Sequence, residues 1–218
     1  MSLSPSLPAE YSTARYDIAA FVAEVEQIIA SEPDRQRIVA AVEERLARLL
    51  TTPDLLAPEH RLSDPDHYWS HLVAVAPSGA FSVVALVWLP GQTTPVHDHI
   101  CWCIVGILEG QECETRFQLM QNVAGERWLL PVGEEVMAPG TTGVLFPPDE
   151  NIHQVGNVGE TVAISIHVYG ADLATVATHS SINECFDALP IRHDTNGVAI
   201  PWRATQDAGC AEVDHAFD

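Results

Sequence analysis

Apolar residues near the start of the chain recur at intervals of three and four, which is the period of an amphipathic helix. The first such segment covers about residues 14–30, and the second follows Ser31, which we interpret as its N-cap because Asp34 comes three residues later and Pro33 lies in the first turn. The two apolar stripes consist of Ile18, Phe21, Val22, Val25, Ile28 and Ile29, and of Ile38, Val39, Val42, Leu46, Leu49 and Leu50. We predict two helices packed on the outside of the main domain, with a recruitment or dimerisation surface as the alternative.

After a turn-rich connector at residues 53–65, the period of the apolar positions changes from 3.6 to about 2. Short apolar or alternating runs separated by turn signals follow at 81–89, 100–108, 113–119, 143–146 and 162–168. Short, regularly spaced strands are typical of a β-sandwich or barrel, here interpreted as a double-stranded β-helix. We therefore predict a mainly β protein, with a helical segment at 1–55 packed on a barrel domain at 56–218 that ends in an irregular tail.

Composition narrows the classes of function. The chain has 218 residues and 47% hydrophobic content, enough for one domain with a full core. Its 30 acidic and 10 basic residues give a formal net charge of −20, which repels phosphate backbones and anionic membranes, so we expect no nucleic-acid and no membrane partner. The five cysteines do not form a dense secreted framework, no apolar run reaches the roughly 18 residues of a membrane span, and the start lacks the pattern of a signal peptide. We expect a cytoplasmic protein, whose oligomeric state the sequence leaves open.

Three histidines carry the first chemical signal. His97 and His99 are separated by one residue, so on a strand both would point to the same face. Two histidines alone are a weak signal, but His153 follows in a turn that leads into another strand. Neutral imidazoles suit iron, zinc, copper or nickel. We predict that the three side chains hold one metal ion.

The segments around these histidines resemble the two motifs of the cupin superfamily. The residues that fall on the motif spacing are Gly91, His97, His99 and Gly110 in the first motif and Pro148, His153 and Asn157 in the second. Two glycine positions of the second motif carry Thr142 and Glu150 instead. The resemblance implies a cupin barrel with a metal site.

Two further features narrow the resemblance. Cys103 occupies the position of the glutamate in the first motif, which leaves three neutral ligands and open positions for substrate and oxygen. Ser165, His167 and Tyr169 alternate along another run, so they share one strand face and can hydrogen-bond in series, with a satisfied core network as the alternative. Both features resemble the cysteine dioxygenase family and related thiol dioxygenases, including 3-mercaptopropionate dioxygenase, over about residues 68–170.

This resemblance implies an iron(II)-dependent thiol dioxygenase, an oxidoreductase that adds both atoms of O2 to the sulfur of a small thiol such as cysteine, 3-mercaptopropionate or a relative, giving a sulfinate. The Fe(II) ligands would be His97, His99 and His153. Tyr169 would orient substrate or oxygen through its hydroxyl, with His167 and Ser165 setting its hydrogen bond. Some family members link a cysteine at the position of Cys103 to the tyrosine by a thioether, which makes a Cys103–Tyr169 bond a hypothesis for this chain.

The arginines that hold the substrate carboxylate in this family are missing from their expected positions. Residues 68–70 read Tyr-Trp-Ser where cysteine dioxygenases have Tyr-x-Arg, and residues 172–178 lack the arginine of mercaptopropionate-type enzymes. The candidates for substrate binding are then Arg116, Tyr68 and His71, with Arg192 and Arg203 as weaker ones. A surface salt bridge is the alternative for Arg116, and a substrate without a carboxylate is the alternative for the site.

Two other functions stay open at this point. One is a cupin oxygenase with a non-thiol substrate or a further-oxidised sulfur product. The other is a non-catalytic cupin that senses a small molecule. The alternating Ser165, His167 and Tyr169 argue against a sensor, because a sensor needs no such series of polar groups.

Overall fold

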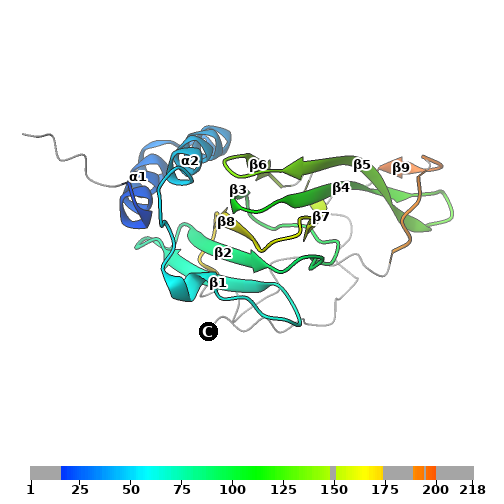
Figure 1. The fold of residues 1–218 in the computed structure, drawn as a ribbon. Helices are drawn as coiled ribbons and strands as arrows, with labels where there is room; N and C mark the ends of the chain where they lie inside the picture. The colour runs from blue at the N-terminus through cyan, green and yellow to red at the C-terminus, as the bar shows by residue number, and fades with distance from the viewer. Residues whose placement is uncertain (1–15, 148–150, 174–188, 194, 200–218) are drawn as a thin grey trace, which may run out of the picture.

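The computed structural model describes residues 16–147, 151–173, 189–193 and 195–199 (Figure 1). Two α-helices, α1 (Ile18–Ser31) and α2 (Arg35–Leu49), come first, followed by a short 3-10 helix, η1 (Pro58–Arg61). The strands are β1 (Trp69–Val75), β2 (Ser82–Trp88), β3 (Cys103–Glu109), β4 (Glu112–Gln121), β5 (Arg127–Met137), β6 (Thr142–Leu145), β7 (Ile152–Asn157), β8 (Ala163–Tyr169) and β9 (Val198–Ala199). The prediction of a mainly β fold preceded by two helices is confirmed.

The strands form two antiparallel sheets. One has the order β1-β2-β8-β3-β6, and the other has the order β5-β4-β7 with β9 beside β4. β1 and β2, and β4 and β5, are consecutive in the sequence, whereas β8 lies between β2 and β3 although it comes much later in the chain. The inner faces pack together, since Val84 and Trp88 of the first sheet share a cluster with Val155 of the second.

The five-stranded sheet is covered on both faces. Its outer face packs against α1 and α2, which lie beside this sheet in Figure 1, in a core that contains Phe21, Val25, Leu46, Leu49, Val83, Ala85, Val87, Ile104, Ile164, Ile166 and Val168. All seven residues of β2 are buried. A strand buried on both faces has no polar alternation, and this explains the continuous apolar run seen in the sequence. Because α2 and the sheet share this core, the domain boundary near residue 55 stays a prediction.

The start of α2 differs from the prediction. The helix is capped by Asp34, whose carboxylate accepts a hydrogen bond from the backbone N–H of Arg37 at 3.0 Å. Ser31 is instead the last residue of α1, and its hydroxyl donates to the carbonyl of Gln27 at 2.7 Å. Pro33 disfavours helical backbone in the residue before it, so the first helix ends at this point and the cap shifts to the next good acceptor.

Three strands, β1, β5 and the short β9, were missed in the sequence, and the start of one predicted strand was placed too early. β1 and β5 are outer strands of their sheets. The middle of β5, residues 132–136, is exposed, and Pro131 and Gly133 interrupt it, so it shows no apolar alternation. The run expected at 100–108 begins as β3 only at Cys103, and the residues before it follow an irregular path.

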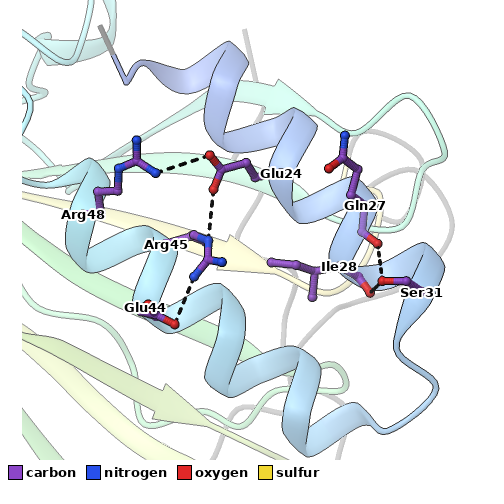
Figure 2. Close-up of a pocket in the computed structure, with 7 residues that line it drawn as sticks. All are labelled: Glu24, Gln27, Ile28, Ser31, Glu44, Arg45 and Arg48. Carbon is purple, nitrogen blue, oxygen red and sulfur yellow. Dashed lines mark hydrogen bonds and ion pairs between the residues drawn. The ribbon is translucent and has the colours of Figure 1, made fainter. Parts of the chain in front are cut away.

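A shallow depression lies on the helical pair and is lined only by residues of α1 and α2 (Figure 2). Glu24 accepts hydrogen bonds there from Arg45 at 3.0 Å and Arg48 at 3.3 Å. These side chains are partly exposed, and such surface ion pairs contribute little to stability. We assign no chemistry to this depression.

Candidate metal centre

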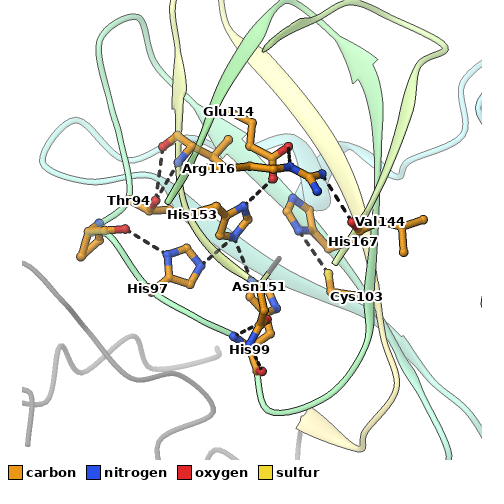
Figure 3. A network of polar contacts seen from close by, with 12 residues as sticks. Thr94, His97, His99, Cys103, Glu114, Arg116, Val144, Asn151, His153 and His167 are labelled. Carbon is orange, nitrogen blue, oxygen red and sulfur yellow. Dashed lines mark hydrogen bonds and ion pairs between the residues drawn. The ribbon is translucent and has the colours of Figure 1, made fainter. Parts of the chain in front are cut away.

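The imidazoles of His97, His99 and His153 converge on one point (Figure 3). The Nε2 atom of His153 lies 3.2 Å from Nε2 of His97 and 3.0 Å from Nε2 of His99. His153 belongs to β7, but His97 and His99 lie in the irregular segment between β2 and β3. The expectation that these two share a regular strand is therefore wrong, whereas the structure does bring the three predicted residues together.

Backbone pairing and one amide side chain hold this irregular segment in place. The N–H of His97 donates to the carbonyl of His153 at 2.9 Å, and the N–H of His153 donates back at 2.8 Å. Asn151 then replaces a strand partner for His99: its Oδ1 accepts from the His99 N–H at 3.0 Å, and its Nδ2 donates to the His99 carbonyl at 2.8 Å. Asn151 is buried and was missed in the sequence, where an asparagine two residues before the motif histidine was the one available signal.

The Nδ1 atoms of His97 and His153 are hydrogen-bonded on the side away from the centre, which leaves the lone pair of each Nε2 facing the centre. Nδ1 of His97 lies 2.9 Å from the carbonyl of Pro95, and Nδ1 of His153 lies 2.8 Å from Oε1 of Glu114. Since these acceptors need a proton on Nδ1, each Nε2 presents a lone pair to the centre. Burial and the neighbouring histidines hold the pKa values of His99 and His153 well below the usual range, so both rings are neutral. Neutral nitrogens facing one point at these distances suit a bound cation.

Glu114 is a second residue that sequence reasoning missed. It is nearly buried on β4, and its two oxygens join different partners: Oε1 accepts from His153 and Oε2 accepts from Nε of Arg116 at 3.0 Å. Nη2 of Arg116 also donates to the carbonyl of Val144 at 3.4 Å. A carboxylate behind a ligating histidine fixes the orientation of the ring and raises its basicity. The guanidinium predicted to hold substrate is thus engaged in holding Glu114.

A second polar cluster meets the histidines on the inner face of the five-stranded sheet. Cys103 on β3 lies directly opposite Tyr169 on β8, and the Tyr169 hydroxyl is hydrogen-bonded to the Cys103 sulfur. Nδ1 of His167 lies 3.5 Å from the Tyr169 hydroxyl and 3.9 Å from the Cys103 sulfur, and its Nε2 lies 2.9 Å from the Ser165 hydroxyl. The Tyr169 ring stacks on that of His99, with centroids 5.7 Å apart and an interplanar angle of 11°. The predicted series of polar groups is therefore continuous and ends beside a histidine of the triad.

All members of this cluster are neutral near pH 7. Burial, together with the nearby His97, lowers the pKa of His167 to about 3. Burial raises the pKa of the Cys103 thiol and of the Tyr169 phenol well above their ordinary values. Cys103 raises the pKa of Tyr169 further, whereas the hydrogen bond from Tyr169 partly opposes the rise at Cys103. The cluster can therefore pass a proton along hydrogen bonds without holding a net charge at rest.

The family model for cysteine dioxygenase type I matches residues 20–181, which is most of the chain. The chain belongs to the cysteine dioxygenase type I family. It is accordingly a metal-dependent dioxygenase, an oxidoreductase that uses O2 and a small-molecule substrate, and its three-histidine cluster is a candidate metal site. None of the helices in the described part of the chain has the length and apolarity needed to cross a membrane.

Several solved structures are similar to about half of this chain. An uncharacterised protein with a double-stranded β-helix domain from Klebsiella pneumoniae is 16% identical, with a TM-score of 0.39, and the match covers 52% of this chain and 85% of that one. A cupin superfamily protein from Desulfitobacterium hafniense is 12% identical, with a TM-score of 0.37 and coverage of 51% and 84%. Oxalate oxidase in complex with glycolate is 21% identical, with a TM-score of 0.37 and coverage of 50% and 54%. Likeness at this level says nothing about activity.

Two glycines show why the cupin motif spacing requires this residue. Gly91 and Gly110 have backbone φ angles of +80° and +73°, a left-handed conformation that other residues rarely adopt. A Cβ at Gly110 would also lie 2.6 Å from the Cα of Ala163 on the neighbouring strand. Gly110 therefore permits the tight turn between β3 and β4. Pro148 and Glu150 of the second motif lie outside the described residues, while Asn157 is buried and donates to the carbonyl of Trp88 at 3.0 Å.

The residues expected to bind substrate are not gathered at one place. Tyr68 stacks on Trp88, with ring centroids 4.5 Å apart, and belongs to the same inner cluster as Tyr169. His71 lies opposite Ala85, which faces the helices, so its side chain is on the outer face, and its Nε2 contacts the carbonyl of Leu62 at 2.8 Å. Among the weaker candidates, Arg192 packs over the ring of Trp128, and Arg203 lies outside the described residues. The structure thus separates His71 from the metal centre.

Proposed function

We propose that this member of the cysteine dioxygenase family is an iron(II)-dependent thiol dioxygenase. In the proposed reaction a small thiol, cysteine, 3-mercaptopropionate or a relative, receives both atoms of O2 on its sulfur and becomes a sulfinic acid. The observation that supports this most directly is the donor set: three histidine nitrogens converge, and Cys103 takes the place of the carboxylate that would complete a four-ligand cupin site. Three protein ligands on one side of an ion leave room for two small molecules.

His97, His99 and His153 would hold the ion. A bound ferrous ion would supply the redox chemistry, together with open positions for the thiolate and dioxygen. The chain's own residues prepare these positions: Glu114 and Pro95 fix the orientations of the His153 and His97 rings, and burial keeps the rings of His99 and His153 neutral and able to bind metal.

The Tyr169 hydroxyl would position the substrate sulfur or oxygen, because its ring already lies against that of His99. His167 contacts this hydroxyl, and Ser165 in turn contacts His167. The two groups offer a route along which the thiol proton can move away from the centre. The same contacts support the thioether hypothesis. Formation of the thioether would join the Cys103 sulfur to the Tyr169 ring, with loss of two hydrogen atoms to oxygen as the oxidant. An intact mass lower by two hydrogen atoms would support the bond, and an unshifted mass in fully active enzyme would exclude it.

The structure sharpens the question of the substrate carboxylate. Ser70, at the position where cysteine dioxygenases carry arginine, pairs with Leu86 and so faces the interior. Arg116 is bound to Glu114, and the roles of Arg116 and Tyr68 in substrate binding stay predictions. An Arg116→Ala variant separates the alternatives. A raised KM for cysteine with an unchanged KM for cysteamine, which has no carboxylate, would identify a clamp. Reduced metal content with both KM values unchanged would identify a support for Glu114.

Oxygen consumption by the iron-loaded protein with a panel of thiols, followed by mass analysis of the products, tests the proposal. We expect uptake with at least one small thiol and a product heavier by the two atoms of O2. A product with another oxygen count, or uptake only with non-thiols, would favour the alternative oxygenase. No uptake with any substrate by protein that holds its iron would favour the small-molecule sensor. The cytoplasmic location and the lack of a nucleic-acid partner stay predictions.

A further inference from the structure

Glu112 is a buried acidic residue that the proposed reaction does not yet use. It is the first residue of β4, and its side chain is 0% exposed. Neither carboxyl oxygen has a hydrogen bond of good geometry within the described part of the chain. A buried carboxyl without such a partner is costly in free energy, so its retention in a barrel interior calls for a physical explanation.

The polar groups that act on Glu112 belong to the cluster described above. They are the hydroxyl of Ser165 and the indole N–H of Trp88, and both favour the ionised carboxylate. Trp88 also donates to the Ser165 hydroxyl oxygen at 3.3 Å. Ser165 in turn contacts Nε2 of His167, whose Nδ1 faces Tyr169. Glu112 therefore adjoins the end of the series that lies farthest from the metal centre.

The hydrogen bonds of this series can run in either of two directions. A protonated carboxyl would donate to Ser165 once the two groups draw together, Ser165 would donate to Nε2 of His167, and the ring proton would sit on Nδ1, facing Tyr169. An ionised carboxyl would instead accept from Ser165, Nε2 of His167 would carry the proton and donate to Ser165, and Nδ1 would accept from the Tyr169 hydroxyl. The two states differ in whether His167 gives or takes a hydrogen bond at Tyr169.

We propose that Glu112 is a positioning residue that terminates the Ser165–His167–Tyr169 series and sets the direction of its hydrogen bonds. The proposal rests on the proposed function only for what Tyr169 does at the metal centre. None of the three groups within the series sets the direction by itself, because hydroxyls and a neutral imidazole can all both donate and accept.

The surroundings of Glu112 favour a change of state near neutral pH. Burial raises the pKa of Glu112 to about 8, against the smaller opposing effects of Ser165 and Trp88. The strands packed against it present Trp88 from β2, Ser165 from β8, and Asn157 and Met137 as the residues opposite it on β7 and β5. No charged group in the described chain is among the causes of this shift.

Histidine ¹⁵N NMR on the full-length, metal-free protein reads the state of His167 directly. We expect the wild-type His167 signals to change from the Nδ1–H to the Nε2–H tautomer as the pH rises through about 8. Glu112→Gln, which keeps the shape but does not titrate, should abolish this change. Glu135→Gln, which removes an exposed carboxylate from the neighbouring strand β5, should leave the change intact. A wild-type protein without the tautomer change, or a Glu112→Gln protein that retains it, would overturn the proposal.

Ser165→Ala provides a second test that does not depend on altering Glu112. The carboxyl band of Glu112 in infrared difference spectra should still titrate, while His167 no longer follows it. Retention of the coupled tautomer change in Ser165→Ala would also overturn the proposal. Because these measurements need neither iron nor a thiol, they stay valid if thiol oxidation is not found. In active enzyme, Glu112→Gln should additionally remove an inflection near pH 8 from the pH profile of kcat, with KM changed less than about threefold.

Discussion

The outer and inner faces of the five-stranded sheet are built by the same strands, yet they hold different chemistry. Along β8 the residues on the helix side are Ile164, Ile166 and Val168, and those on the inner side are Ser165, His167 and Tyr169. The outer residues pack on α1 and α2 without a polar contact, whereas every inner one is part of a hydrogen-bonded series. A strand's twofold alternation thus lets one segment supply both stability and reactivity.

The two faces of the sheet therefore have different roles, one in stability and the other in chemistry. The apolar outer face buries large side chains and stabilises the fold. The polar residues on the inner face of β8 contribute less to stability, because buried polar groups give little net free energy even when paired. Substitutions on the outer face should therefore change the unfolding free energy and spare the chemistry, and substitutions of the polar inner residues should do the reverse.

The largest effect is expected from the histidine triad. His153→Ala removes the one nitrogen that contacts both of the other two, so bound metal and oxygen consumption should both be lost. Metal analysis of the purified protein and an oxygen electrode measure this. His193→Ala, an exposed histidine, is the matched control and should behave as wild type. Full metal content in His153→Ala would contradict the assignment of the site.

The next effect concerns the outer face. Leu46 of α2 is fully buried against the sheet, and Leu46→Ala should lower the unfolding free energy by about 2–5 kcal/mol through lost burial and a cavity. Chemical denaturation measures this, and kcat per bound metal should stay near the wild-type value at temperatures where the variant is folded. Leu62→Ala, at a side chain that is 62% exposed, should change stability little. A collapse of kcat in folded Leu46→Ala would show that the two faces are not separable.

Glu114→Gln should act on the inner site without unfolding it. An amide holds the Nδ1–H of His153 less strongly than a carboxylate, so metal affinity or activity should fall roughly 10- to 100-fold. Metal titration and thermal unfolding together separate affinity from stability. Glu134→Gln, at an exposed position of β5, is the control, and equal affinities in the two variants would refute the role of Glu114.

The smallest effect is a pH dependence of stability from Glu112. Its pKa rises from 4.5 in the unfolded chain to about 8 in the folded protein, so the folded state holds the proton more tightly between these values. The unfolding free energy should therefore fall as the pH rises through this window, by up to about 1.4 kcal/mol per pH unit from this group. The difference between wild type and Glu112→Gln in denaturation at several pH values isolates the contribution. Parallel pH curves for the two proteins would show that the carboxyl does not shift on folding.

The elements that could be predicted from the sequence are those whose apolar positions repeat with the period of a helix or of a strand. The helices show the 3.6-residue stripe, and β8 shows apolar and polar positions in alternation, so both were predictable. The outer strands β1 and β5 were not, because their partial exposure removes the alternation. The histidine triad was found through its spacing even though His97 and His99 do not lie on a strand. The prediction of the metal site was right because the motif spacing is specific, and not because the two histidines share the face of a strand.

The supporting residues of the site were beyond reach of sequence patterns. Glu112 and Glu114 lie two apart in a strand otherwise rich in charged and polar residues, which reads as a solvent-facing side. The structure buries both of them, because this face of β4 is turned toward the other sheet: Glu112 lies opposite Met137, which packs in a cluster with Cys103 and Tyr169. The side chain of Asn151 makes the two hydrogen bonds that the backbone of a neighbouring strand would otherwise make. No local sequence preference indicates that an asparagine will take this role.

The hydrogen bonds between Asn151 and His99 have a consequence for the order in which parts of the protein fold. His99 and its partner His153 are 54 residues apart, and their segment is held in place only once β7 has docked beside it. Closing such a long loop is slow compared with forming local helices, so the triad is assembled late. A newly made chain would then present no complete metal site until its barrel has closed. Any choice among metal ions would then be made by the assembled histidine triad rather than by an unfolded chain.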